Sequence, residues 1–262
     1  MTENLSGCYL FGSKGRPALN KWINSILPHE YVAYAEPYAG MLGVLLNRPK
    51  SGVEIASDLN DRIINWWLMV RDKTEELIEK VTWTPCSEKL FYEYYDTIDE
   101  GSDIERAVKL QVVLTHSRMQ SDNRRYFGFR ISRGSSKNYE HTLSQMRLLR
   151  ERIKHVTLLN RDAFDILERL SKESHMVIYC DPPYATADTS LYRVDEVRDL
   201  TTLLKDQKSK VAVSGYNDEF DHLDWERHEM DVSYAEGIQG KEQPKRTEVL
   251  WTNYNAGSQL TF

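Results

Sequence analysis

The residues best suited to chemistry follow an apolar run in the last third of the chain. Met176 to Cys180 has the composition of a buried strand, and the next four residues are Asp181, Pro182, Pro183 and Tyr184. A carboxylate and backbone carbonyls accept hydrogen bonds, and proline has no N–H to donate. The tetrapeptide therefore offers acceptors at a strand end, beside an aromatic ring that could stack on a flat ligand.

Such acceptors suit one demanding reaction, the transfer of a methyl group to an exocyclic amine of a nucleobase. The lone pair of that amine is delocalised into the ring and attacks only when the amine hydrogens are drawn toward acceptors. The Asp181 carboxylate and a proline carbonyl would accept them and stabilise the positive charge that develops on nitrogen. Inside a duplex the amine of adenine is inaccessible, so the base would be flipped out. The alternative interpretation is a plain turn after a strand.

A second pattern, strand, turn and helix, lies near the start of the chain. Tyr31 to Ala35 predicts a short strand, Glu36-Pro37-Tyr38-Ala39-Gly40 a turn, and Met41 to Leu46 an apolar helix. Asp58 closes the next predicted strand, Gly52 to Ser57, and stands 22 positions after Glu36. The spacing suits a nucleoside, because glycine lets the backbone approach a ligand and the second acid can accept from ribose hydroxyls. For Asp58 alone, helix capping is the alternative.

The remaining periodicities predict a mostly parallel α/β sheet. Strand-like runs recur at residues 155–159, 176–180, 210–214 and 248–254, and apolar residues at helical spacing lie in segments 19–26, 63–68 and 197–204. Alternating strands and helices imply a doubly wound sheet, whose ligands bind at the carboxyl ends of its strands. Between about residues 76 and 151 a charged, aromatic and mostly helical stretch interrupts this order. We therefore predict an inserted domain.

Charge is distributed unevenly around this insertion. The chain has a net charge of -6, which argues against nonspecific coating of nucleic acid. Residues 115–150 nevertheless carry eight Lys or Arg against two acids, whereas residues 88–106 carry seven acids against two bases. A sign reversal of this kind predicts one surface that faces a polyanion, and a solvated charged face is the alternative. The candidate DNA contacts are Arg118, Arg124, Arg125, Arg130, Arg133 and Lys137.

Composition excludes several classes of protein. With 262 residues, 40% of them hydrophobic, the chain fits one large α/β domain or a core with an insertion. No apolar run reaches the roughly 18 residues of a membrane span, and the polar start does not resemble a signal peptide, so we expect a cytoplasmic protein. Its three cysteines are odd in number and far apart, which argues against a disulfide framework and against a metal site.

Together these motifs resemble the Dam-like, D12 class of DNA adenine N6-methyltransferases, and the likeness covers most of the chain in the same order. Asp181 to Tyr184 resembles the catalytic tetrapeptide of the family. The other matching positions resemble its cofactor-binding motifs: Phe11, Gly12, Ser13 and Lys14 at the N-terminus, Glu36, Tyr38 and Gly40 in the cofactor loop, Asp58 as the ribose-binding acid, and Asp162 and Phe164 beside the cofactor adenine. Leu42 departs from the family, which often has a second glycine there, and Leu10 stands where an aromatic residue often precedes the lysine motif.

The resemblance implies an S-adenosylmethionine-dependent enzyme with a Rossmann-like, seven-stranded sheet. Residues 1–75 and 152–262 would form the catalytic domain, and residues 76–151 a mostly helical domain that recognises double-stranded DNA. By the same resemblance, Lys14 would meet the methionine carboxylate of the cofactor. We expect no metal and no membrane, and a monomer, with a dimer on DNA as the alternative.

Two other functions fit part of the sequence. Methylation of cytosine N4, or of adenine in RNA, needs the same acceptor geometry, although Asp before Pro-Pro-Tyr favours adenine by family resemblance. A catalytically silent module that binds DNA or cofactor is the alternative from another class. The intact tetrapeptide from Asp181 to Tyr184 argues against it.

Overall fold

A computed structural model describes residues 17–117, 134–183, 200–232 and 246–256, together with Leu5 and Phe129. The chain divides into two compact units, which we describe separately. The helical unit comprises Met1–Arg16, Gly40–Arg48 and Asn60–Asn160, and the sheet unit comprises Pro17–Ala39, Pro49–Leu59 and Arg161–Phe262. In the described part of the chain, no helix is long and apolar enough to cross a membrane.

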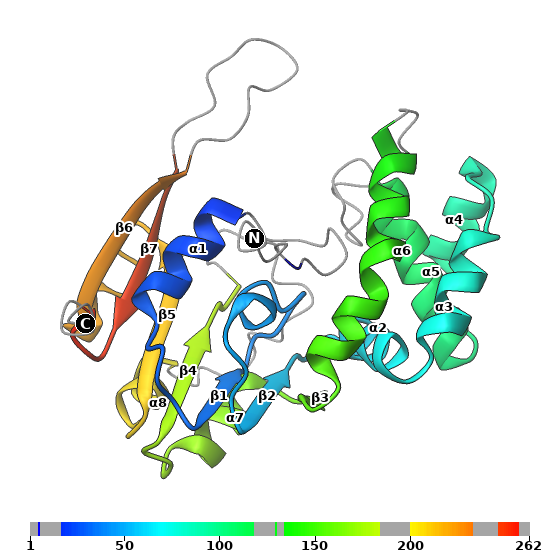
Figure 1. The fold of residues 1–262 in the computed structure, drawn as a ribbon. Coiled ribbons are helices and arrows are strands. Elements are labelled where there is room, and N and C mark those ends of the chain that lie inside the picture. The colour runs from blue at the N-terminus through cyan, green and yellow to red at the C-terminus, as the bar shows by residue number, and fades with distance from the viewer. Residues whose placement is uncertain are drawn as a thin grey trace. The chain divides into compact units, whose positions relative to one another are not determined.

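Seven strands form one sheet in the order β3-β2-β1-β4-β5-β7-β6 (Figure 1). Their bounds are β1 (Ala33–Glu36), β2 (Val53–Ser57), β3 (Thr157–Leu159), β4 (Met176–Cys180), β5 (Lys210–Tyr216), β6 (Glu226–Val232) and β7 (Arg246–Thr252). β1 is parallel to β2 and β4, and β4 is parallel to β5, while β7 is antiparallel to both β5 and β6. The predicted seven-stranded, mostly parallel α/β sheet is confirmed.

The order of the strands reverses between β1 and β4. From β1 the chain moves outward to β2 and later returns to place β4 on the other side of β1, with Ala35 aligned to Ile178. In open α/β sheets, ligands bind outside the carboxyl ends of the strands at such a reversal. Glu36 ends β1 and Asp181 follows β4, so both residues flank this point.

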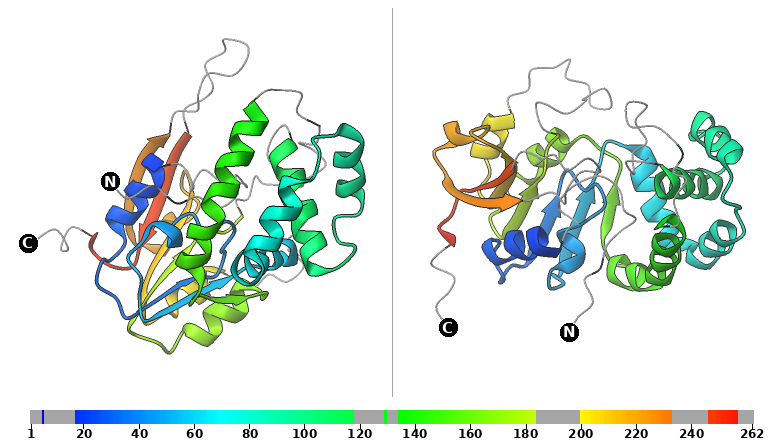
Figure 2. Two further views of the ribbon diagram at one scale, coloured as in Figure 1. Left: turned by 45° about the vertical axis from the view of Figure 1, so that its right-hand side comes forward. Right: turned by 90° about the horizontal axis from the view of Figure 1, so that it is seen from above.

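The two faces of the sheet differ in chemistry. Alternation along each strand and the register between strands place Ala35, Ile178, Val213 and Trp251 on one face. This face is apolar and packs against leucines of α7 (Ala163–Leu170) and α8 (Leu200–Lys205). The helix α1 (Pro17–Ile26) lies on the opposite face (Figure 2). Toward the carboxyl ends of the strands this face becomes polar. Its polar members are Tyr34, Glu36, Tyr179, Ser214 and Glu248.

The helical unit contains the segment between β2 and β3. Its helices are α2 (Asp61–Asp72), α3 (Thr74–Thr82), α4 (Glu88–Asp96), α5 (Asp103–His116) and α6 (Gly134–Ile153). Trp66 and Trp67 are fully buried and meet edge to face, with ring centroids 4.8 Å apart. The prediction of a mostly helical insertion is confirmed, and the border near residue 75, together with the DNA-recognition role of residues 76–151, stays a prediction.

Two elements differ from the sequence-based expectations. The prediction of an apolar helix from Met41 to Leu46 is wrong, because only a short 3-10 helix, η2 (Leu45–Asn47), forms there. Gly40 and Leu42 have φ of 45° and 55°, a left-handed conformation that a right-handed helix cannot contain. The edge strand β6 was not predicted, because its sequence, Glu-Arg-His-Glu-Met-Asp-Val, carries charges on both faces, as edge strands often do.

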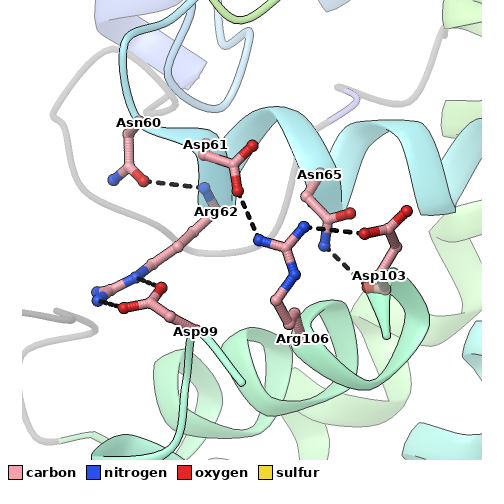
Figure 3. Close-up of polar contacts among 7 residues, drawn as sticks. All are labelled: Asn60, Asp61, Arg62, Asn65, Asp99, Asp103 and Arg106. Carbon is pink, nitrogen blue, oxygen red and sulfur yellow. Dashed lines mark hydrogen bonds and ion pairs between the residues drawn. The ribbon is translucent and has the colours of Figure 1, made fainter. Parts of the chain in front are cut away.

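Ion pairs join the start of α2 to the start of α5 and the turn before it (Figure 3). Arg62 forms a bidentate pair with Asp99 through two contacts of 2.6 Å, which lowers the pKa of that carboxyl. Arg106 contacts Asp61 at 2.5 Å and Asp103 at 2.9 Å. The helix itself starts where the Asn60 side chain accepts from the backbone N–H of Arg62, at 3.1 Å. Within the helical unit, these contacts fix the first turn of α2.

We expect Arg106→Met to lower the free energy of unfolding by about 1 kcal/mol, because the guanidinium that two carboxylates share is then removed. The side chain of Arg106 is 19% exposed, so solvent screens it only in part. Urea denaturation at low and at high salt measures the effect, which should shrink as salt rises. Arg147→Met is the control, because Arg147 also forms a bidentate pair, with Glu75, but both side chains are at least 60% exposed. Equal destabilisation by the two substitutions would contradict the prediction.

Candidate active site

Asp181 lies at the carboxyl end of β4. All five residues of that strand are buried, and Asp181 is the first, partly buried residue beyond it. Pro182 is buried and Pro183 is partly buried. The structure thus places the predicted acceptors at a strand end beside the reversal of strand order. Tyr184 lies outside the described residues.

A chain of hydrogen bonds reaches the Asp181 carboxylate from the polar face of the sheet. Ser214 on β5 donates from Oγ to Asp181 Oδ1 at 2.9 Å, and the Tyr179 hydroxyl lies 3.0 Å from the same Oγ. Burial, together with the negative charge of Asp181, raises the pKa of Tyr179 well above its ordinary value. Burial likewise raises the pKa of the Cys180 thiol. Both groups therefore stay protonated at neutral pH, and neither adds a negative charge beside Asp181.

Glu36 ends β1 on the same face. It is 2% exposed, and the hydroxyl of Tyr34 donates to its Oε1 at 2.8 Å. The two residues are separated by one position in a strand and so share a face. The hydroxyl offsets part of the cost of burying this carboxylate.

Ser57 draws three chain segments together at the end of β2. Its carbonyl accepts from the backbone N–H of Ala39 at 2.8 Å, and its hydroxyl donates to the carbonyl of Arg161 at 2.9 Å. The turn after Glu36, the residue Asp58 and the residue Asp162 are therefore brought to one edge of the sheet unit. Three positions that were predicted from distant parts of the sequence meet there.

The two aspartates at this edge differ in their local role. Asp58 is 3% exposed, and Asn60 rather than Asp58 caps α2, so the alternative interpretation of Asp58 as a helix cap is wrong. Asp162 does cap a helix, because its Oδ1 accepts from the backbone N–H of Phe164 at 2.8 Å at the start of α7. The predicted roles of Asp58, Asp162 and Phe164 toward a cofactor stay predictions.

The turn around Gly40 depends on backbone conformation. A Cβ added to Gly40 would meet nothing within 4 Å, so its positive φ rather than crowding selects glycine. Leu42 also has a positive φ, which costs a non-glycine residue about 1 kcal/mol. Its side chain is fully buried, and that burial compensates the strain. Tyr38 packs partly buried against the apolar cluster of the sheet unit.

The remaining predicted residues are not placed. These residues lie outside the described part of the chain: Phe11, Gly12, Ser13, Lys14, Arg118, Arg124, Arg125, Arg130 and Arg133. Lys137 is part of α6, but its side chain is not described. Sequence reasoning, in turn, missed four hydroxyl residues that organise the site: Tyr34, Ser57, Tyr179 and Ser214. The available signal was a polar residue within or at the end of an otherwise apolar strand.

Comparison with known proteins decides the family. A model of the D12 class N6 adenine-specific DNA methyltransferases matches residues 11–224. The chain belongs to this family. A Type II methyltransferase of Lactococcus lactis subsp. cremoris, M1.LlaDCHI, is 26% identical over 277 positions, which cover 92% of this chain and 93% of the relative. A solved structure, the SAM-dependent methyltransferase from Agrobacterium tumefaciens, has a TM-score of 0.40 and 8% identity, and the match covers 92% of this chain and 62% of that one.

Membership of the D12 class confirms the enzyme class that the motifs predicted. The protein is a methyltransferase specific for N6 of adenine in DNA, and S-adenosylmethionine is its methyl donor. The residues at the edge of the sheet fit such a donor, because it carries positive charge and hydroxyl groups. Glu36 and Asp58 are buried acceptors at the ends of adjacent strands. Glu36 suits the cationic part of the cofactor, and Asp58 suits the ribose hydroxyls.

We expect Asp58→Asn to weaken binding of S-adenosylmethionine by about 10-fold or more, because an amide replaces a charged acceptor of hydroxyl protons. Isothermal titration calorimetry without DNA measures this directly. Asp72→Asn is the control for the change of charge, because Asp72 pairs with Arg71 on the exposed side of α2. Unchanged affinity in Asp58→Asn would remove Asp58 from the cofactor site.

Proposed function

We propose that this D12-class enzyme methylates an adenine flipped out of double-stranded DNA, and that Asp181, Pro182, Pro183 and Tyr184 form its catalytic site. One observation carries the proposal. The Asp181 carboxylate lies beside the reversal between β1 and β4, and the Ser214 hydroxyl holds one of its oxygens at 2.9 Å. A carboxylate with a fixed direction is what an amine acceptor requires.

In the proposed mechanism, the chain prepares the amine for attack. Asp181 accepts one hydrogen of the amino group, and a proline carbonyl of the tetrapeptide accepts the other. Both bonds draw the nitrogen toward tetrahedral geometry and stabilise its developing positive charge. S-adenosylmethionine supplies an electrophilic methyl group carried on a sulfonium. The surplus proton of the methylated nitrogen leaves by way of the Asp181 carboxylate. Tyr184 stacks on the flipped base.

We further propose that residues 76–151 recognise the DNA target. Support comes from the reversal of charge within this stretch and from its helical build between β2 and β3. The basic residues between 118 and 137 would contact phosphates, and one or two would read base edges. The protein would act on DNA in the cytoplasm, as a monomer. Its relative M1.LlaDCHI is named a Type II methyltransferase, which favours a role in restriction-modification.

We expect wild-type enzyme to leave N6-methyladenine at a defined sequence, and Asp181→Ala to lower the transfer rate by about 1,000-fold. The reason is that the lone pair of the amine stays in conjugation without its acceptor. Sequencing of modified bases in DNA exposed to each protein, with mass spectrometry of digests, measures both. Affinity of Asp181→Ala for S-adenosylmethionine, measured by calorimetry, should change by no more than about 3-fold.

Each other outcome has its own meaning. N4-methylcytosine as the sole product would replace adenine by cytosine as the target. Turnover by Asp181→Ala at the wild-type rate would refute the mechanism. If the wild-type protein binds S-adenosylmethionine but methylates no duplex, it is the catalytically silent binding module.

We expect replacement of Arg118, Arg124 or Arg125 by glutamine to weaken DNA binding and to reduce its salt dependence. For each phosphate that the variant no longer neutralises, the slope of log affinity against log salt becomes shallower by about 0.9. Fluorescence anisotropy over a salt series measures the slope. Arg147→Gln is the control, because Arg147 pairs with Glu75 on α3 and lies outside the proposed contacts. An unchanged slope in all three variants would place the interface elsewhere.

A further inference from the structure

The hydrogen-bond chain behind Asp181 has a defined direction. Oδ1 of an ionised Asp181 can only accept, so the single hydroxyl proton of Ser214 points to it across 2.9 Å. The other contact of that hydroxyl, to the carbonyl of Cys180, is longer, at 3.4 Å. Ser214 Oγ is therefore left as an acceptor for the Tyr179 hydroxyl, 3.0 Å away. Protons point from Tyr179 to Ser214 and from Ser214 to Asp181.

All three residues are held firmly. Ser214 is 1% exposed and Tyr179 is 3% exposed. The register aligns Cys180 with Val213 and Tyr179 with Ala212, so Asp181 and Ser214 face each other across adjacent strands. A bond to Oδ1 fixes the rotation of the carboxylate about its Cβ–Cγ bond. That rotation decides where the second oxygen, Oδ2, faces.

Tyr179 also lies beside Glu36, because the pairing of Ala35 with Ile178 brings Glu36 level with Tyr179. Burial and, with it, the negative charges of Asp181 and Glu36 raise the pKa of Tyr179, so Tyr179 keeps the proton that it donates to Ser214. The chain thus ends on a donor that does not ionise in the neutral range.

We propose that Ser214 is a positioning residue of the transfer reaction, and that Tyr179 supports it by donating to its hydroxyl. In this role Ser214 does not touch the base. It turns the Asp181 carboxylate so that one oxygen faces the amine at the moment of attack. The inference rests on the proposed catalytic role of Asp181, because a fixed carboxylate has no such consequence if Asp181 is not the acceptor.

The test compares Ser214→Ala with a matched control, Ser209→Ala. Ser209 directly precedes β5 at its other end, is 2% exposed, and donates to the carbonyl of Glu173 at 2.7 Å. Each substitution removes one buried serine hydroxyl. Ser214→Ala also removes the acceptor of the Tyr179 hydroxyl, so it should reduce stability more than Ser209→Ala does. We expect kcat of Ser214→Ala to fall about 10- to 100-fold, by analogy with residues that orient metal ligands through a hydrogen bond, and kcat of Ser209→Ala to stay unchanged. KM for DNA and the affinity for S-adenosylmethionine should stay near wild type in both.

Two further variants distinguish the loss of these hydrogen bonds from a loss of packing. Ser214→Thr keeps the hydroxyl and should restore most of the kcat that Ser214→Ala removes. Tyr179→Phe should lower kcat by about 3- to 10-fold in the wild-type background, and should cause no further decrease in Ser214→Ala, because the acceptor of its proton is then gone.

The outcomes are distinct. If wild type methylates adenine and Asp181→Ala does not, but Ser214→Ala matches Ser209→Ala in kcat, the positioning role is refuted and the proposed function stands. Additive decreases from Tyr179→Phe and Ser214→Ala would refute the support by Tyr179. If Ser214→Ala does not fold, kcat of Tyr179→Phe is the deciding measurement. A wild-type kcat in that variant would refute the effect of the hydrogen-bond chain on the reaction. Failure of the proposed function itself would show in Asp181→Ala, which would then retain activity.

Discussion

The parallel pairing of β1 with β4 is the constraint on which the site depends. It joins segments separated by some 140 residues of sequence and aligns Ala35 with Ile178. Because parallel strands end at the same edge, the pairing brings Glu36 and Asp181 to one place, at the point where the strand order reverses. Separated from this pairing, Asp181 would keep Ser214 of β5 beside it but would lose Glu36 and the end of β1 as neighbours.

One face of the sheet contributes most to stability, and the other carries the polar residues of the site. Val211, Val213, Val249 and Trp251 are buried on one face against α7 and α8, where apolar burial stabilises the sheet unit. The other face can then carry acids and hydroxyls close to the strand ends. Burying a carboxylate there would be costly without donors. Glu36 has Tyr34 and Asp181 has Ser214, so for each of these acids a neighbouring hydroxyl offsets part of that cost.

Sequence patterns revealed the features that are local. The bounds of β4, for example, follow from one apolar run. The prediction of a helix from Met41 to Leu46 failed, because apolar composition carries no information about the left-handed backbone conformation at Leu42. Of the candidate site, the acids and the tetrapeptide could be predicted. Tyr179 and Ser214 could not, because their roles arise from the register of β4 and β5, which no spacing along the chain encodes.

The register of β5 against β4 links the packing on one face of the sheet to the polar contacts on the other. Shifting β5 by one residue against β4 would turn Ser214 to the apolar face and Val213 toward Asp181. The apolar face forbids this shift, because a serine would be buried among leucines without a partner and a valine would leave the apolar core. Tyr34 and Glu36 face each other under any register, since both lie on β1. The contact between Ser214 and Asp181 exists only because packing on the far side of the sheet selects one register. The direction of the Asp181 carboxylate is thus determined by apolar residues that never contact it.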